Sequence, residues 1–159
     1  MTLGKFIEAR WDNAQEAYKA RRWSEAQRDA RMVAVTLPEA GRAMMLCGMC
    51  VAPIGLSERA LAMLQRAHAT GPDDALVLTR LSEALYAAGR FNEAETAMRR
   101  ALSRGISIGQ GNFHLAKILW LKGQIEEARE ALEIAEIAEP GLAERRIILE
   151  YTVSSRDFA

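Results

Sequence analysis

The sequence predicts an all-α protein built from four helix-turn-helix repeats. Its 159 residues are rich in alanine, leucine, glutamate and arginine, which favour helices. Four stretches, RRWSEAQRDA, IGLSERALAML, GRFNEAETAM and KGQIEEAREAL, are similar to one another. Their alanines Ala26, Ala60, Ala94 and Ala128 are each 34 residues apart. One structural unit therefore repeats along the chain without insertions.

Within one repeat, the apolar pattern predicts two helices joined by a tight turn. In the stretch ALVLTRLSEALYAAG, Leu78, Leu81 and Leu85 fall on one face of a helix. Gly89 can adopt the left-handed conformation that ends this helix, and Phe91 then anchors the turn. Each repeat is therefore expected to be a helix hairpin.

Capping residues predict where several helices begin. The pairs Asn92–Glu95 and Ser24–Gln27 resemble capping boxes for second helices. The aspartates at 73–74 are suitable N-caps for the helix that follows them.

The register divides the chain into repeats within a single domain spanning residues 1–159. The repeats fall at approximately 7–40, 41–74, 75–108 and 109–142, with a C-terminal capping helix at 143–153. The first repeat is degenerate, because Arg10 and Asn13 occupy apolar positions; a polar outer face is expected where a repeat stack meets water. The last residues resemble the start of another turn, which leaves open whether the natural chain continues.

This pattern resembles the tetratricopeptide repeat family, whose signature W-x2-L-G-x2-Y, A-x3-F, P recurs every 34 residues. The matching residues are Met44, Cys47, Gly48, Val51, Ala60, Leu64 and Pro72, then Leu78, Leu81, Ser82, Leu85, Ala94 and Met98, then Leu115, Ala116, Leu119, Ala128, Leu132 and Pro140. The resemblance covers roughly residues 7–142. It implies a right-handed α-α superhelix, a tetratricopeptide solenoid, whose concave side is lined by the first helix of each repeat and holds an extended or helical peptide.

Projected through this register, the sequence predicts which residues line the concave groove and bind a partner. They are Trp11, Gln15, Tyr18, Met45, Met49, Thr79, Arg80, Glu83, Tyr86, Phe113, Lys117 and Trp120, with Ala52 at one further position. Aromatic residues and methionines favour apolar anchors on the partner. The alternative is that these side chains cover one another or pack under the tail. Members that clamp a C-terminal carboxylate are a poor match, because only Arg80 fits that clamp.

The resemblance implies a non-catalytic adaptor that binds a peptide-like segment of another protein and needs no cofactor or metal. Its groove is similar to members that hold hydrophobic segments, including secretion chaperones and bacterial assembly scaffolds. The alternatives are a self-assembling scaffold, which would be a homo-oligomer, and an N-terminal appendage of a larger, possibly enzymatic, protein.

Three local features are candidates for a redox, metal or phosphate site. Cys47 and Cys50 form a C-x-x-C pair for which core packing, redox sensing and metal binding stay open, with packing favoured by their mid-helix positions. His68 is expected at the surface or between repeats, and His114 beside the groove. The stretch RGISIGQGNF, residues 104–113, lacks the Gly-Lys-Ser/Thr of a phosphate loop. It is expected to be a loose joint whose glycines precede a helix capped by Asn112.

Charge and hydropathy exclude several classes of protein. The formal net charge is zero, which argues against a nucleic-acid partner. No apolar run approaches the roughly 20 residues that span a bilayer, and no signal peptide is evident, so a cytoplasmic protein is expected. A basic cluster lies at 19–31 and an acidic run at 126–139. These are expected to be solvated helix faces or, alternatively, a head-to-tail contact between copies.

Overall fold

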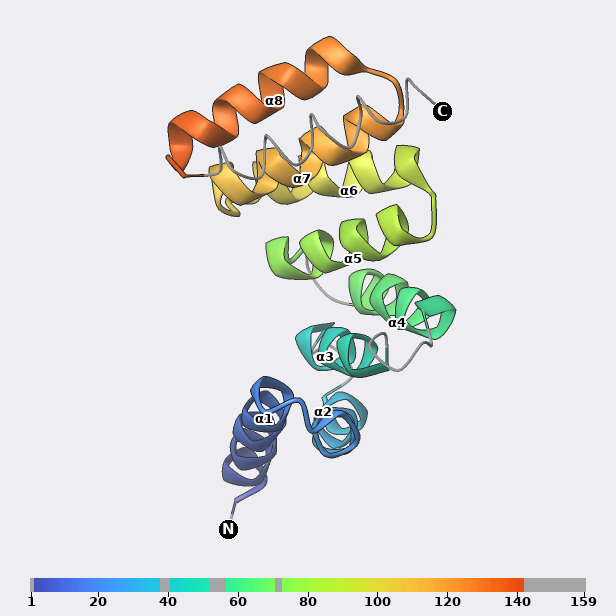
Figure 1. Ribbon diagram of the computed structural model, residues 1–159. Coiled ribbons are helices and arrows are strands. Elements are labelled where there is room, and N and C mark those ends of the chain that lie inside the picture. Colours follow the sequence, from blue (N-terminus) through green and yellow to red (C-terminus); the bar gives the residue numbers. More distant parts are fainter. Residues whose placement is uncertain (1, 38–40, 52–56, 71–72, 142–159) are drawn as a thin grey trace.

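A computed structural model describes residues 2–37, 41–51, 57–70 and 73–141, and these ranges hold eight α-helices and no strand (Figure 1). The helices are α1 (Leu3–Lys19), α2 (Trp23–Thr36), α3 (Gly41–Val51), α4 (Ser57–Thr70), α5 (Ala75–Ala87), α6 (Phe91–Ser103), α7 (Ile108–Leu121) and α8 (Ile125–Ala138). The predicted all-α superhelix is confirmed. The predicted capping helix at 143–153, together with Ala52, Pro53 and Gly55, lies outside the described residues.

Consecutive helices pack in pairs, and the pairs stack in chain order from α1 at one end to α8 at the other (Figure 1). The second helix of each pair packs on the first helix of the next pair, so the apolar core runs along the stack. Small residues allow close approach within a pair. Ser82 is fully buried, and its hydroxyl donates a 2.7 Å hydrogen bond to the carbonyl of Ala94.

The turn inside three pairs uses one left-handed residue at the same repeat position. Gly89 has φ 76° and Gly123 has φ 80°, as the repeat register predicted for Gly89. In the first pair this position is Arg21, with φ 59°. A side chain with a Cβ is therefore held in a conformation that favours glycine.

The helix starts differ in part from the sequence prediction. Asp74 caps α5 as predicted, accepting hydrogen bonds from the backbone amides of Leu76 at 2.9 Å and Val77 at 3.3 Å. The two predicted capping boxes are wrong. The helices α2 and α6 begin earlier, at Trp23 and Phe91, and neither N-cap residue forms a side-chain capping bond. Asn92 and Ser24 therefore lie inside the first turn and cannot act as caps.

The glycine-rich stretch is also built differently from the prediction. The cap of α7 is Ser107, which accepts from the amide of Gln110, so the proposed cap at Asn112 is wrong. Gly109 and Gly111 lie inside α7 and are buried, rather than preceding it. A Cβ at Gly111 would collide with Leu102 and would lie 2.8 Å from Cδ1 of Ile106. Gly111 therefore lets α7 pack closely on α6, where a loose joint was expected, and Gly109 leaves room for Glu139.

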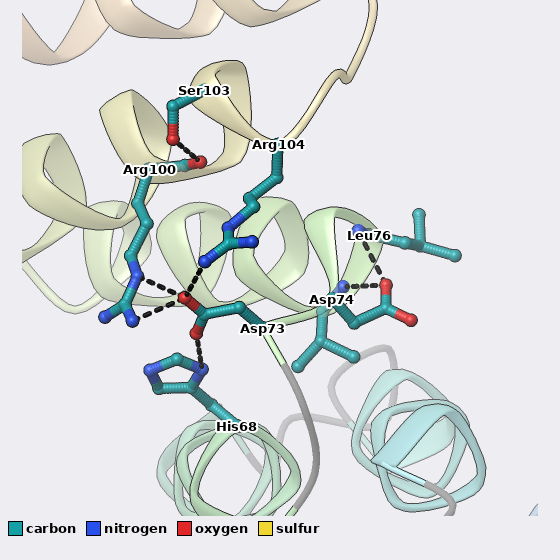
Figure 2. Close-up of polar contacts among 8 residues, drawn as sticks. His68, Asp73, Asp74, Leu76, Arg100, Ser103 and Arg104 are labelled. Atoms are coloured by element: carbon teal, nitrogen blue, oxygen red, sulfur yellow. Dashed lines mark hydrogen bonds and ion pairs between the residues drawn. The ribbon is translucent and has the colours of Figure 1, made fainter.

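Asp73 connects two helix pairs at the joint between α4 and α6 (Figure 2). Its carboxylate accepts a 2.8 Å hydrogen bond from Nε of Arg100 on α6 and a 3.1 Å bond from Arg104, the C-cap residue of that helix. Its other oxygen lies 3.9 Å from Nδ1 of His68 on α4, which is the inter-repeat position expected for that histidine. Burial favours a raised pKa for Asp73, but the hydrogen bond and charge of Arg100, with Arg104 and His68, hold that pKa below its ordinary value.

Candidate functional site

A groove of about 790 Å³ lies along the first helices α1, α3 and α5. Apolar side chains make up most of its lining, which includes Trp11, Tyr18, Met45 and Met49. These residues follow the 3-4 spacing that places side chains on one helix face, and the repeat brings the same face of each first helix to the groove. The groove can accommodate a peptide-sized apolar ligand.

Six of the predicted partner-binding residues line this groove. They are Trp11, Gln15, Tyr18, Met45, Met49 and Arg80. Met45 is buried, whereas the other five are half-buried and present part of their surface to the groove.

The two aromatic residues of α1 that line the groove, Trp11 and Tyr18, are supported by contacts on the side away from the groove. Tyr18 meets the ring of Trp23 edge to face, with centroids 5.3 Å apart. Trp11 packs against buried residues of two neighbouring apolar clusters. Both side chains are therefore supported before any partner arrives, which lowers the entropy cost of using them for binding.

An ion pair lies at the edge of the groove and joins α3 to the start of α5. Nε of Arg42 is 2.7 Å from Oδ2 of Asp74. Burial favours a raised pKa for Asp74, but the hydrogen bond from Arg42 and those from the amides of Val77 and Leu76 outweigh it, so the pKa lies below its usual value. The pair connects two groove-lining helices at the edge of the groove.

A second, smaller hollow of about 200 Å³ lies between α5 and α7 and holds three more predicted residues, Glu83, Tyr86 and Lys117. Here the side chains engage one another. Nζ of Lys117 lies 5.5 Å from the centroid of the Tyr86 ring and 5.3 Å from that of Phe113. This half of the concave side therefore shows the internal covering that the sequence analysis kept as its alternative.

Ion pairs add to this internal covering. Glu83 accepts a 2.9 Å hydrogen bond from Arg80, and its other oxygen lies 3.5 Å from Nε2 of His114. His114 lines this smaller hollow and does not line the groove along α1, α3 and α5. Its imidazole and the neighbouring Lys117 already have partners within the chain.

The remaining three predicted residues line neither hollow. The hydroxyl of Thr79 donates to the carbonyl of Ala75 at 2.8 Å. Phe113 is buried, and Trp120 packs against the main core cluster. Tyr18, Tyr86 and Trp120 occupy the same position of the 34-residue repeat, yet they have different surroundings.

Several groove residues were missed by the sequence analysis, some because the projection began one helical turn too late and others because they lie at the end of α1 or on α2 and its C-cap. They include Ile7, Glu8, Lys19, Val33, Leu37, Arg42 and Leu76. Glu8, Arg42 and Leu76 are 34 residues apart and precede Trp11, Met45 and Thr79 by three. Extending the stripe by one turn would have found this row.

The C-x-x-C pair lies in the core rather than at a reactive surface. Cys47 is 2% exposed and Cys50 is 1% exposed, and both are free thiols. Burial raises the pKa of each to about 11, so both thiols are protonated at neutral pH. Of the three interpretations of this motif, packing is the one that these surroundings support.

The sequence matches two models of one protein family. Residues 12–75 match a family described as tetratricopeptide repeat, and residues 57–105 match a second model of the same description. The chain belongs to the tetratricopeptide repeat family. Among curated proteins none matches the sequence. The described part of this tetratricopeptide repeat chain contains no helix long and apolar enough to cross a membrane.

Solved structures confirm the fold of this tetratricopeptide repeat protein. A crystal structure of MamA aligns with a TM-score of 0.74 at 18% identity, covering 87% of this chain and 81% of that one. YrrB, described as a TPR protein with an unusual peptide-binding site, aligns at 0.71 and 18% identity, covering 85% and 70%. A mutant O-GlcNAc transferase from Thermobaculum terrenum aligns at 0.67 and 25% identity, covering 75% of this chain but 23% of the transferase. Family and fold together support a protein-interaction module.

Proposed function

We propose that this protein is a non-catalytic adaptor that binds a peptide-like segment of another protein in the groove along α1, α3 and α5. The observation that carries the proposal is the groove itself, with a volume of about 790 Å³ and a lining dominated by Trp11, Tyr18, Met45, Met49 and other apolar side chains. YrrB, which shares the fold, is described as having a peptide-binding site. That description supports peptide binding as a use of this fold here.

The proposed site is narrower than the one projected from the sequence. The hollow between α5 and α7 is small, and its polar and aromatic groups are engaged within the chain. A partner would have to displace Lys117 from two aromatic rings to use it. The N-terminal groove needs no such rearrangement, so we assign partner binding to it.

The chemistry of the lining indicates the kind of segment that fits. Aromatic and methionine side chains bind large apolar anchors, and methionine adapts to several shapes. The charged groups Glu8, Lys19, Arg42, Asp74 and Arg80 also line the groove. Two of these, Arg42 and Asp74, neutralise each other. The expected ligand is a short amphipathic segment with two or three large apolar residues.

Selection from a random peptide library displayed on phage tests this function without knowledge of the natural partner. Selected peptides should be enriched in Leu, Ile, Met, Phe and Trp. Their affinity, measured by titration calorimetry, should fall at least about 30-fold with Trp11→Ala or with Tyr18→Ala plus Met49→Ala, because central interface anchors contribute about 2 kcal/mol each.

A matched control is the double variant Met32→Ala plus Val35→Ala, which removes exposed apolar groups from the outer face of α2. It should leave peptide affinity unchanged. Peptides that bind the groove variants as well as the native protein would refute the assignment of the groove.

A further inference from the structure

Helices α2 and α8 are the second helices of the first and fourth repeats, and their outer faces carry complementary residues at the same repeat positions. In α2 the four outer positions are Arg28, Arg31, Met32 and Val35, and in α8 they are Glu130, Glu133, Ile134 and Ile137. Each α8 residue follows its α2 counterpart by 102 residues, which is three repeats. Two arginines and an apolar pair at one end thus face outward in the same pattern as two glutamates and an apolar pair at the other.

The two central repeats do not carry this apolar pair. The positions of Met32 and Val35 are taken by Arg66 and Ala69 in α4, and by Arg100 and Ser103 in α6. Arg100 uses its position to bind Asp73. Exposed apolar pairs on second helices are therefore confined, among the described residues, to the two ends of the stack.

These apolar side chains are open to solvent. Val35 is 73% exposed and Met32 is 38% exposed, while Ile137 is 82% exposed and Ile134 is 47% exposed. Single exposed apolar residues are common on soluble proteins. Here two apolar pairs occupy the same repeat positions, one beside two arginines and the other beside two glutamates. This arrangement indicates that the two surfaces are complementary to each other.

The outer face of α2, which carries Arg28 and Arg31, borders a hollow large enough for a bulky side chain, and we call this hollow the receptor. This hollow of about 510 Å³ lies between α2 and α4, lined by Val35, Met44 and Met63 together with Arg31 and Arg59. No ion pair joins Arg31 or Arg59 to a residue of the described ranges. On α8, likewise, Glu130 and Glu133 form no ion pair with a described residue.

We propose that the acidic outer face of α8 docks on the basic outer face of α2 and α4 of a second copy of this chain. Ile134 and Ile137 enter the hollow between α2 and α4, and Glu130 and Glu133 lie against Arg31 and Arg59. The contact is head to tail, because each copy offers a different surface at each end. Such a contact does not close after two copies and generates a chain of subunits or a ring.

The interface uses few helices, so the association is expected to be weak. Stable interfaces bury roughly 800 Å² on each partner, and a contact between one helix and a two-helix hollow is smaller. Because charge pairs make part of it, raising the salt concentration should weaken it. The groove along α1, α3 and α5 takes no part and stays available to a partner.

Sedimentation of two charge-reversal variants and their mixture tests the proposal. The first is Arg31→Glu plus Arg59→Glu, which spoils the receptor, and the second is Glu130→Arg plus Glu133→Arg, which spoils the acidic face. The native protein should form species larger than a dimer as its concentration rises toward about 1 mM. Each variant alone should sediment as a monomer.

The mixture of the two variants gives the discriminating result. The first variant retains an intact α8 and the second an intact receptor, and the reversed charges of the two variants are also complementary to each other, so mixing them should restore assembly that neither variant shows alone. A control, Lys5→Glu plus Arg21→Glu, reverses two exposed cations outside the groove and the proposed contact, and should assemble like the native protein. Circular dichroism of each variant verifies folding. If one charge variant fails to fold, Ile134→Ser plus Ile137→Ser replaces it and should weaken association at least tenfold.

The proposal is overturned if the native protein stays monomeric at these concentrations, if either charge variant assembles as the native protein does, or if the mixture remains monomeric. A native dimer that never grows would also overturn it, since it would mean a closed two-fold contact. Trp11→Ala, which tests the groove, should not alter sedimentation, so the two proposals fail separately.

Discussion

Arg10 and Asp29 form an ion pair that joins α1 to α2, with Nη1 of the arginine 3.0 Å from Oδ1 of the aspartate. Asp29 is 1% exposed. The equivalent residues in the next two repeats are Met44 with Met63 and Leu78 with Ala97. The first repeat, which the sequence shows to be degenerate, thus replaces an apolar contact with a charged one.

Removing only the arginine of this pair should lower the free energy of unfolding more than replacing both partners by apolar residues. Arg10→Leu leaves the buried Asp29 carboxylate with only the more distant Arg28, and we expect a loss of about 1–3 kcal/mol in the free energy of unfolding. Arg10→Leu plus Asp29→Ala copies the third repeat and should be near neutral or stabilising. Urea unfolding of the two variants measures the difference. A double variant less stable than the single one would show that the charge itself is needed.

Replacing Arg21 by glycine should stabilise the protein. Its φ of 59° is a conformation that costs an L-residue about 1 kcal/mol and costs glycine little. We expect Arg21→Gly to raise the unfolding free energy by about 0.5–1 kcal/mol. The reverse change, Gly89→Ala at the equivalent turn, should lower it by a similar amount. Thermal unfolding of both variants checks the sign, and equal melting temperatures would contradict the proposed strain.

Acid should weaken the stack at its inter-repeat joints. The pKa values of Asp73, Asp74 and Glu95 all lie below their ordinary values, because burial, which favours raised values, is outweighed by hydrogen bonds and nearby cations. These groups therefore stabilise the fold above the ordinary pKa of a carboxyl, about 4, and that stability is lost as the pH falls through the lowered values. Urea midpoints should drop steeply below about pH 4.

Asp74→Asn provides the matching variant for the acid experiment. Asparagine keeps the N-cap of α5 but loses the charge that binds Arg42. The variant should be less stable at pH 7 and should show a shallower loss in acid. An unaltered pH profile would mean that this joint does not contribute to acid unfolding.

Both cysteines should resist alkylation in the folded protein. With a pKa of about 11, roughly one thiol in a thousand is ionised at pH 8, and burial blocks access as well. Labelling by a thiol reagent should proceed at the rate of local or global opening, while protein unfolded in guanidinium should react within seconds. Rapid labelling of either thiol in the native state would restore a redox role.

The repeat architecture was predictable because it depends on periodicity, which a single sequence displays. The 34-residue register located the helix pairs, the left-handed turn at Gly89 and the aspartate cap of α5. The first residues of the helices were harder to predict from the sequence. The capping boxes at Asn92 and Ser24 looked complete, yet the tight turn begins each helix earlier, which local side-chain preference does not reveal.

The candidate site was likewise predictable only where it depends on the repeat register. Register placed Trp11, Tyr18, Met45 and Met49 on the concave side, where they line one groove. Whether such a side chain stays available depends on neighbours that are distant in sequence. Lys117 covers Tyr86 from the next repeat, which only the packing of α5 on α7 shows. Likewise, Gly109 and Gly111 suggested a loop until their contacts with Glu139 and Leu102 were known.

The central claim is that the groove along α1, α3 and α5 is the interaction surface. It is tested most directly by calorimetric titration of one selected peptide into the native protein, Trp11→Ala and Met32→Ala plus Val35→Ala. We expect Trp11→Ala to weaken binding at least about 30-fold and the outer-face variant to bind like the native protein. Equal affinity of the native protein and Trp11→Ala would contradict the account.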